Sequence, residues 1–347
     1  MPTALINALI VNLPEFGGTQ IAPLRFERHI LSLGVSPKRG DTVLDLAGFA
    51  IYPGLVNAHD HLELNHFPRS KFREVYDNAY QWGEEFLPRL AQEPFCSLRQ
   101  VPLSEQCRIG LEKNLRSGVT TVAHHNPLHR PLRRKTPIRI LSQYGWAHSL
   151  HFTGADAVRA RYLKTPKRFP FMIHLAEGTD EAMQGELSSL DELGCLGHNT
   201  VLIHGVGLTE SDRQRAINAG AGLVWCPSTN LYLLGKTAQV AEFSRARRLA
   251  IGSDSLLTAD GDLLDELRAA YATGQLTPES LFRAVTVDAA ELLCLPEIGV
   301  IAPNYRADLL VTLVPSGDPY AALIQLRREQ IVQVFVGGLP RLAKTQS

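Results

Sequence analysis

The spacing of hydrophobic positions changes along the chain and divides it into three stretches. Towards both ends, short apolar runs rich in Ile, Leu and Val predict β-strands with no helical pattern between them. These runs are residues 3–11, 24–33, 42–46, 308–314 and 330–338. In the middle, apolar runs alternate with longer amphipathic segments, which is typical of βα units around a parallel sheet. The pattern therefore predicts an α/β protein with a separate all-β part.

The middle stretch contains eight strand candidates, and helical patterns separate most of them. The strand candidates are residues 54–59, 119–125, 138–141, 146–152, 170–175, 200–206, 222–227 and 249–255, and the clearest helical patterns are residues 104–118, 179–194, 209–220 and 237–248. This arrangement predicts a (β/α)8 TIM-like barrel over residues 51–297, close to its usual length of ~250 residues. The third and fourth candidates lie too close for the crossover helix that a parallel pair normally needs. We therefore expect an irregular barrel at that point, where one candidate either extends the other or leaves the ring incomplete.

The two all-β ends predict a second domain. Residues 1–50 and 298–347 are expected to form one small, discontinuous β-sandwich domain beside the barrel of residues 51–297. The two ends of the chain must then meet in space, as the termini of domains often do.

Composition and charge exclude several classes of protein. The 35 basic and 35 acidic residues give a formal net charge of zero, so nothing favours nucleic acid or an anionic membrane as a partner. The five cysteines are scattered and form no CxxC pair, which argues against a disulfide framework and against a cysteine zinc site. The sequence shows neither a signal peptide nor an apolar run of ~20 residues, so we expect a cytoplasmic protein.

One local run of charge departs from this balance. Arg130, Arg133, Arg134, Lys135 and Arg139 follow one another closely. They predict a solvated loop and helix edge, and the alternative is a patch that attracts an anionic substrate.

The histidines are placed unevenly on the predicted scaffold. His59, His125, His174 and His204 lie at or near the C-terminal ends of strand candidates, and Asp254 lies at the end of the last one. The C-terminal face of a barrel is where active sites are built. His59 and His61 are alternate residues of a strand, so both imidazoles face the same side and can chelate one metal ion. The alternative is a pair of polar side chains that are satisfied within the fold.

The other candidates extend this site. His174 ends a very apolar strand, where burial without a partner is costly, although a core histidine bonded to backbone is the alternative. Glu177 follows just past the strand end, the position of a proton shuttle. His204 repeats the pattern on the next strand, as either a ligand or an electrophile. Three imidazoles and one carboxylate suit one divalent ion, Zn²⁺ first, with Fe²⁺ or Mn²⁺ as alternatives. Such an ion lowers the pKa of a bound water to ~7, which yields hydroxide at neutral pH.

Taken in order, the motifs resemble the amidohydrolase superfamily, in the branch of cytosine deaminase, guanine deaminase, adenosylhomocysteine deaminase and the triazine hydrolases. The matching segments are PGLVNAHDHLE (53–63), GVTTVAHH (118–125), IHLAEG (173–178), LIHGVGL (202–208), CPSTNLYLLG (226–235) and IGSDS (251–255). Residues 276–293 resemble the helix pair after the last strand of that branch. Residues 298–311 resemble its return into the small β domain, with Asn304 in place of the usual glycine.

The resemblance implies a role for each matching residue. It makes His59, His61, His174 and Asp254 the metal ligands, and it makes Asp254 a proton acceptor for the attacking water as well. Glu177 matches the proton shuttle, and His204 matches the histidine that polarises the substrate. Neither central strand candidate contains the lysine that binuclear members carboxylate, so a mononuclear centre is predicted. Residues 62–110 and 138–170 are shorter than in that branch, so the substrate does not carry over.

The predicted function is hydrolysis of a C–N bond other than a peptide bond. Deamination of a nitrogen heterocycle by metal-bound hydroxide, with Glu177 as proton shuttle, is the first hypothesis. The alternatives are a cyclic amide or chloro-triazine hydrolase and, from another class, a non-catalytic metal-binding homologue. The expected partner is a small-molecule substrate, and a homodimer is left open. The candidates for substrate contact are His125, Asn126, Trp82, Arg69 and Asn230, while His66, His129, His148 and His151 receive no role.

Overall fold

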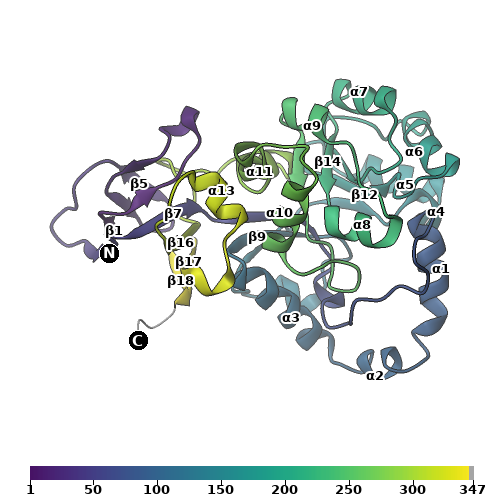
Figure 1. Ribbon diagram of the computed structural model, residues 1–347, viewed down its shortest axis with the longest axis horizontal. Coiled ribbons are helices and arrows are strands. Elements are labelled where there is room, and N and C mark those ends of the chain that lie inside the picture. The colour runs from purple at the N-terminus through teal and green to yellow at the C-terminus, as the bar shows by residue number, and fades with distance from the viewer. Residues whose placement is uncertain (344–347) are drawn as a thin grey trace.

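The computed structural model describes residues 1–343, which form a β-rich part at one end and a larger part of strands and helices at the other (Figure 1). The larger part contains eight strands in two parallel sheets. One sheet has the order β10-β9-β8, with β8 (Leu55–Asp60), β9 (Val119–His124) and β10 (Arg139–Ile140). The other runs β11-β12-β13-β14-β15, with β11 (Gly145–Ala147), β12 (Phe171–Leu175), β13 (Thr200–His204), β14 (Gly222–Trp225) and β15 (Leu249–Ile251). The described strands therefore form two arcs rather than a closed ring.

The irregular point is the one that the sequence predicts. β10 and β11 are separate short strands, joined by residues 141–144 with no helix between them. The predicted strand over residues 146–152 is wrong beyond Ala147. Ser149 accepts a hydrogen bond from the backbone N–H of Phe152 at 3.1 Å and so begins helix α4 (Leu150–Thr153). A serine N-cap stops the strand because its side chain satisfies a free N–H of the first helical turn.

Helices follow most of the barrel strands and cover them. The helices of the described residues are α1 (Ala79–Arg89), α2 (Phe95–Leu98), α3 (Leu103–Arg116), α4, α5 (Ala155–Lys164), α6 (Glu181–Glu192), α7 (Glu210–Asn218), α8 (Pro227–Leu234), α9 (Ala241–Arg245), α10 (Leu263–Ala272), α11 (Pro278–Ala284), α12 (Val287–Leu292) and α13 (Pro319–Ile324). The 3-10 turns are η1 (Pro14–Phe16), η2 (Leu62–Leu64), η3 (Arg130–Arg133) and η4 (Arg328–Gln330). The four predicted helices correspond to α3, α6, α7 and α9. The sequence did not predict α8, whose eight residues are too short for a clear periodicity; it ends at Gly235 with φ +64°.

The β-rich part consists of two sheets that share one hydrophobic core. The sheets have the orders β5-β4-β1-β6 and β18-β17-β16-β7-β2-β3, with β1 (Thr3–Ile6), β2 (Leu9–Ile10), β3 (Gln20–Ile21), β4 (Leu24–Phe26), β5 (Ile30–Leu33), β6 (Thr42–Asp45), β7 (Phe49–Pro53), β16 (Leu309–Leu313), β17 (Ile331–Val336) and β18 (Leu339–Ala343). β7 pairs antiparallel with β16, so both ends of the chain contribute to this part. Asn304 has φ +73°, a left-handed conformation that asparagine tolerates better than most residues and that glycine adopts freely.

The predicted domain boundaries stay a prediction. β7 runs across residue 50 and continues the β-rich part to Pro53. Within residues 1–343, none of the helices has the length and apolar character needed to span a bilayer.

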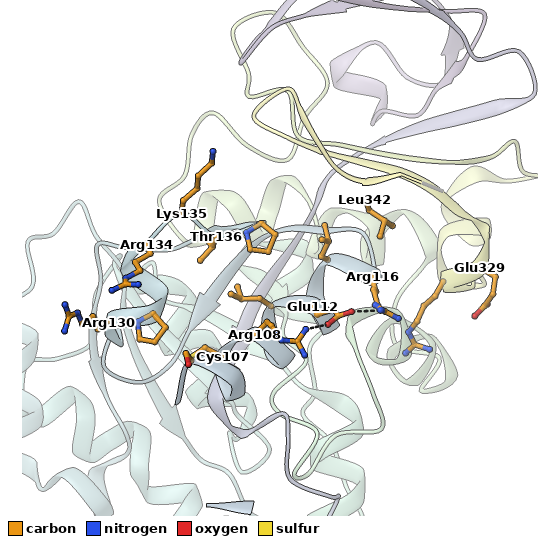
Figure 2. Close-up of a pocket in the computed structure, with 16 residues that line it drawn as sticks. Cys107, Arg108, Glu112, Arg116, Arg130, Arg134, Lys135, Thr136, Glu329 and Leu342 are labelled. Atoms are coloured by element: carbon orange, nitrogen blue, oxygen red, sulfur yellow. Dashed lines mark hydrogen bonds and ion pairs between the residues drawn. The ribbon is translucent and has the colours of Figure 1, made fainter. Parts of the chain in front are cut away.

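The basic run of the sequence faces a cavity of about 1040 Å³ beside α3 and the end of β18 (Figure 2). Arg130, Arg134 and Lys135 line this cavity, together with Arg108 and Arg116 of α3. The histidines and Asp254 of the predicted metal centre are not among its lining residues. The basic run and the predicted metal centre therefore face different cavities.

Candidate active site

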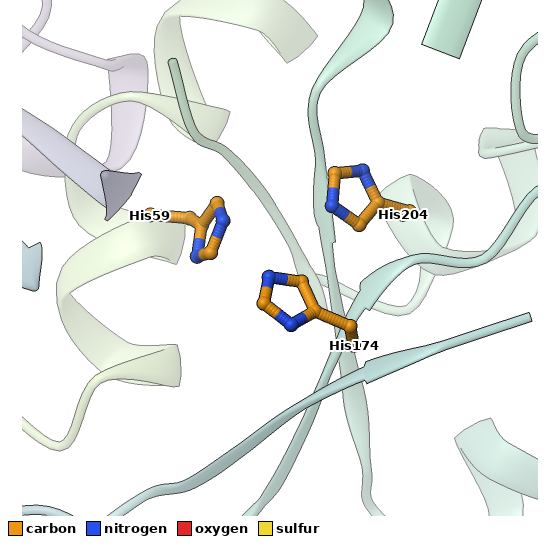
Figure 3. Close-up of side chains that lie close together, drawn as sticks. All are labelled: His59, His174 and His204. Atoms are coloured by element: carbon orange, nitrogen blue, oxygen red, sulfur yellow. The ribbon is translucent and has the colours of Figure 1, made fainter. Parts of the chain in front are cut away.

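The predicted metal-binding residues meet at the C-terminal ends of the barrel strands. His59 is the last residue but one of β8, and His61 directly follows this strand. His174 comes from β12 and His204 from β13. Asp254 lies three residues beyond β15, and its backbone N–H donates to the carbonyl of His59 at 3.0 Å. Figure 3 shows the rings of His59, His174 and His204 turned towards a common space. The polar residues at the strand ends of both sheets therefore lie close together.

The distances between these side chains suit a shared ion. The Nε2 atoms of His59 and His61 lie 3.6 and 3.7 Å from Oδ1 of Asp254. Possible ligand atoms of these three residues lie within 4.8 Å of one another, and the same holds for the group of His59, His174 and His204. Two overlapping groups with His59 in both describe a single centre.

His59 itself tests whether a metal ion fits this centre. Its side chain is fully buried, and neither ring nitrogen has a hydrogen-bond partner among the described residues. Burying imidazole nitrogens without partners is costly, so a cation that accepts their lone pairs fits the site. His174 supports the same conclusion, because its Nδ1 lies 2.7 Å from the carbonyl oxygen of His148. That contact fixes the ring so that Nε2 faces the centre, as is usual for histidine ligands.

Burial also sets the protonation states that ligation requires. It lowers the pKa of His59 and, more strongly, that of His174, so both imidazoles are neutral at pH 7. Burial alone would raise the pKa of Asp254, but the close approach of His59 and the other neighbouring imidazoles holds it below its usual range. Neutral imidazoles and an ionised carboxylate are the forms that bind a divalent ion.

Glu177 and His204 form a pair beside this centre. Nε2 of His204 lies 3.4 Å from Oε1 of Glu177, and its Nδ1 lies 3.0 Å from the amide nitrogen of Asn230. Burial raises the pKa of Glu177 well above its ordinary value, and the charge of Asp254 raises it further. A carboxyl group with a raised pKa is suited to act as a general acid.

Three residues of the site adopt a strained backbone conformation. His204, Asp254 and Ala176 have positive φ angles of 75°, 49° and 53° at or just past the ends of β13, β15 and β12. Left-handed conformations in residues other than glycine are costly and cluster at functional sites. Here they occur where each strand has to turn its last side chain into the space above the barrel.

The site opens into a cavity of about 750 Å³ with aromatic walls. His61, His174, Glu177, His204 and Asp254 line its inner end. The rest of the wall includes the aromatic side chains of Phe67, Tyr80, Trp82, Phe86, Trp146 and Phe152. A planar, aromatic small molecule fits such walls, because ring faces bury large apolar areas against one another.

The five residues predicted to contact substrate divide into two groups. Trp82 and Asn126 line the cavity, whereas His125, Arg69 and Asn230 are not among its lining residues. His125 is fully buried, with Nε2 2.9 Å from the carbonyl oxygen of Ala147. Arg69 forms an ion pair with Asp260, and Asn230 contacts His204. Direct substrate contact by these three stays a prediction, but their visible contacts are with the protein.

The structure also places the histidines that received no role. His148 lines the cavity, which the sequence did not indicate because it lies just beyond the short strand β11. His66 contacts two backbone carbonyl oxygens, and His151 is paired with Glu84 at the surface. His129 lies 3.4 Å from Glu63, a buried carboxylate that the sequence did not single out. The alternation of His59, His61 and Glu63 is the signal that could have indicated it.

The comparisons with known proteins agree with this geometry. The profile of the amidohydrolase family matches residues 167–340. A 5-methylthioadenosine/S-adenosylhomocysteine deaminase of Desulfitobacterium hafniense is 30% identical over 317 residues, covering 78% of this chain and 74% of the relative.

The chain belongs to the amidohydrolase family.

This membership confirms the resemblance predicted from the sequence. An 8-oxoguanine deaminase of Pseudomonas aeruginosa is 30% identical over 191 residues, which is 49% of this chain but only 42% of that protein. The match to a 5-methylthioadenosine/S-adenosylhomocysteine deaminase of Pyrococcus abyssi likewise covers only 44% of that relative. Activity and substrate are therefore matters of proposal.

Solved structures extend the likeness to the whole fold. An adenosine deaminase from Xanthomonas campestris with bound zinc superimposes with a TM-score of 0.80 at 20% identity, over 98% of this chain and 93% of that one. An atrazine chlorohydrolase from Arthrobacter aurescens complexed with zinc gives 0.82 at 18% identity, over 97% and 94%. The amidohydrolase neighbours imply a TIM-barrel fold, whose strands appear here as two arcs. The expectation of a divalent metal ion agrees with the family and with the histidine and aspartate cluster.

A buried ion pair between Lys113 and Asp60 lies beside the candidate site. Asp60 points away from His59 and His61, is fully buried, and lies 3.0 Å from Nζ of Lys113. Lys113 also donates to the backbone carbonyl of Asp254 at 3.1 Å. This lysine of α3 therefore connects the first and the last strands of the barrel at the level of the metal centre.

We expect Lys113→Met to lower the free energy of unfolding by ~3–5 kcal/mol, because it leaves the buried Asp60 carboxylate without its cation. Chemical unfolding followed by circular dichroism measures the change. The matched control is Lys164→Met on α5, an exposed lysine whose replacement should change stability by less than ~0.5 kcal/mol. Equal stabilities of the two variants would contradict a structural role for the Lys113–Asp60 pair.

Glu266 of α10 gives a test based on pH. Its carboxylate is fully buried and accepts a hydrogen bond from the backbone N–H of Ser228 at 3.0 Å, at the start of α8. Burial raises the pKa of Glu266 to about 8. The folded protein therefore holds this proton up to about pH 8, whereas the unfolded chain releases it near the ordinary glutamate value.

Because the folded state binds the extra proton, the contribution of Glu266 to stability is lost as pH rises from about 5 to about 8. Glu266→Gln should remove ~1–3 kcal/mol of this decline. Urea unfolding at pH 5, 6, 7 and 8 measures the slope, with the exposed Glu279→Gln as the control that keeps it. Parallel slopes for the wild type and Glu266→Gln would show that Glu266 is ionised in the folded state.

Proposed function

We propose that this chain removes an exocyclic amino group from a planar nitrogen heterocycle by hydrolysis, releasing ammonia. The observation that carries this proposal is the Glu177–His204 pair beside the histidine and aspartate cluster, at the inner end of a cavity with aromatic walls. Deamination needs an acid near a ring nitrogen at the moment when water adds to the neighbouring carbon. The raised pKa of Glu177 supports that acid role.

In this proposal His59, His61, His174 and Asp254 hold one divalent ion. Zn²⁺ is the first candidate, because three imidazoles and one carboxylate suit its ligand preferences, and Fe²⁺ or Mn²⁺ are the alternatives. When bound, the ion would supply a water molecule of lowered pKa as the nucleophile. The neutral imidazoles and the ionised Asp254 are in the state needed to bind it.

The side chains divide the proton transfers between them. Asp254 accepts a proton from the attacking water as the new C–O bond forms. Glu177 gives its proton to the ring nitrogen, and His204, which lies beside it, stabilises the developing charge on the added oxygen by a hydrogen bond. The proton on Asp254 then passes to the amino group, the C–N bond breaks, and ammonia leaves. Glu177 recovers a proton when the added hydroxyl group loses its own and becomes the ring carbonyl, so the enzyme returns to its starting state.

Substrate contact is assigned to the cavity wall. Trp82 offers a ring face that stacks on Phe86 with 5.2 Å between the ring centroids, and its Nε1 donates to the carbonyl of Ser70 at 3.0 Å. These contacts hold the indole ring in place, so a flat heterocycle can pack on this wall at little entropic cost. Asn126 lies at the inner end of the cavity and offers an amide for a polar ring substituent.

A screen for ammonia release tests the proposal. Purines, pyrimidines, pterins and triazines with amino substituents are incubated with the protein loaded with Zn²⁺ or Mn²⁺, and ammonia is measured by a coupled assay. Release from at least one class supports deamination. A carboxylate or chloride product without ammonia would instead support the cyclic amide or chloro-triazine alternatives. Bound metal with no turnover of any of these compounds would support the non-catalytic homologue.

A further inference from the structure

A second group of ligand-type side chains lies outside the centre described above. Glu63 of η2, His124 at the end of β9 and His129 just before η3 approach one another although they are up to 66 residues apart. Oε2 of Glu63 lies 3.6 Å from Nδ1 of His124, and Oε1 lies 3.4 Å from Nε2 of His129. Ligand atoms of all three lie within 4.8 Å of one another, which is the spacing expected around a single ion.

The group is buried and its polar atoms are incompletely satisfied. His124 is fully buried, and Glu63 is 8% exposed. Oε2 of Glu63 and Nε2 of His124 have no hydrogen-bond partner within residues 1–343. A buried carboxylate oxygen without a partner is costly, and a cation beside Oε2 of Glu63 would offset much of that cost. His124 presents Nδ1 to the same oxygen, and the backbone N–H of Leu62 lies 3.4 Å from this nitrogen.

We propose that Glu63, His124 and His129 bind a second divalent cation of the Zn²⁺ class. Two imidazoles and one carboxylate form a common ligand set for this ion and leave one position for water. His129 is the only one of the three whose side chain is substantially exposed, at 25%, so the ion enters from its side. Magnesium and calcium fit less well, because they prefer sites made entirely of oxygen.

This second centre is separate from the first but connected to it through Asn126. The amide nitrogen of Asn126 lies 2.5 Å from Oε1 of Glu63 and 3.2 Å from Nδ1 of His61. The backbone carbonyl of Asn126 also accepts a hydrogen bond from the hydroxyl group of Tyr144 at 2.6 Å. An ion bound by Glu63 and His129 would hold the loop between β9 and η3, and with it the position of Asn126 on the cavity wall. The second ion is therefore a positioning element, and the first centre stays mononuclear.

Counting bound zinc tests the proposal without relying on activity. The protein is stripped with a chelator, dialysed against Zn²⁺ and then against buffer, and zinc per chain is measured by mass spectrometry. We expect two equivalents in the wild type and one in Glu63→Gln and His129→Asn. His61→Ala also binds one, but the double variant His61→Ala, His129→Asn binds none. The control His198→Asn, an exposed histidine elsewhere on the surface, keeps two.

The thermal stability of the His61→Ala variant gives an independent measurement if Glu63→Gln does not fold. With only the second centre left, added Zn²⁺ should raise its Tm by several degrees, because the ion binds the folded state alone. The double variant should show no such shift. One equivalent in the wild type, or two in a folded His129→Asn variant, would overturn the second centre. Loss of zinc in His61→Ala alone reports on the first centre, so the two assignments fail independently.

Discussion

We expect Glu177→Gln to lower kcat by ~10²-fold or more while the protein keeps its bound metal. Glutamine preserves the size of the side chain and can still contact His204, but it cannot release a proton to a ring nitrogen. The loss should therefore appear in kcat rather than in substrate binding. Steady-state kinetics on the substrate found by ammonia release, with zinc analysis of the same sample, measures both quantities.

The matched control for this prediction is Glu181→Gln in the first turn of α6. This glutamate is exposed and close to Glu177 in sequence, so its replacement tests for general effects of losing a carboxylate in this region. It should leave kcat unchanged within a factor of two. A Glu177→Gln protein with near-normal turnover would exclude the shuttle role and direct the search for the acid to His204.

We expect His61→Ala to lose the ion of the first centre and to lower kcat/KM by more than ~10²-fold. Nε2 of His61 lies 3.7 Å from Oδ1 of Asp254, so removing the ring takes one nitrogen from the proposed ligand set. The expected loss is large because even neighbours of metal ligands commonly affect metal affinity or activity by 10–100-fold. Zinc analysis and steady-state kinetics on the same preparation measure the two effects.

His198→Ala is the control for this replacement, since His198 is exposed and its ring contacts the carbonyl of Lys167. It should keep both metal and activity. Retention of the full wild-type zinc content in His61→Ala would remove this residue from the ligand set. Activity restored to that variant by added imidazole would instead support direct ligation.

The local sequence pattern was sufficient to indicate which residues form the candidate active site. The alternation of His59 and His61 on a strand places both rings on one face, and the structure places Asp60 on the opposite side with Lys113. The apolar runs before His174 and His204 are strands in the structure as well, and these strands end at Leu175 and at His204. The sequence also predicted that no helix joins β10 and β11, because too few residues separate the two strands.

Contacts between distant segments could not be predicted in this way. Nothing near Glu63 in the sequence indicates that it meets His129, and nothing near Lys113 indicates that a helix side chain reaches both Asp60 and the backbone of Asp254. The same dependence on distant contacts applies to the residues predicted to contact substrate. Asn230 follows a strand end, as a substrate contact would, but α8 turns its amide to His204.

The sequence by itself therefore determined the family, the strand ends and the types of side chain that they carry. These properties depend on periodicity within a few residues, where backbone geometry fixes which way each side chain points. Only the tertiary structure decided that the strands form two arcs, which aromatic rings line the cavity, and that Glu63, His124 and His129 form a second group of ligand-type side chains. Those features depend on how segments far apart in the chain pack together, and packing is set by the shapes of all the side chains at once.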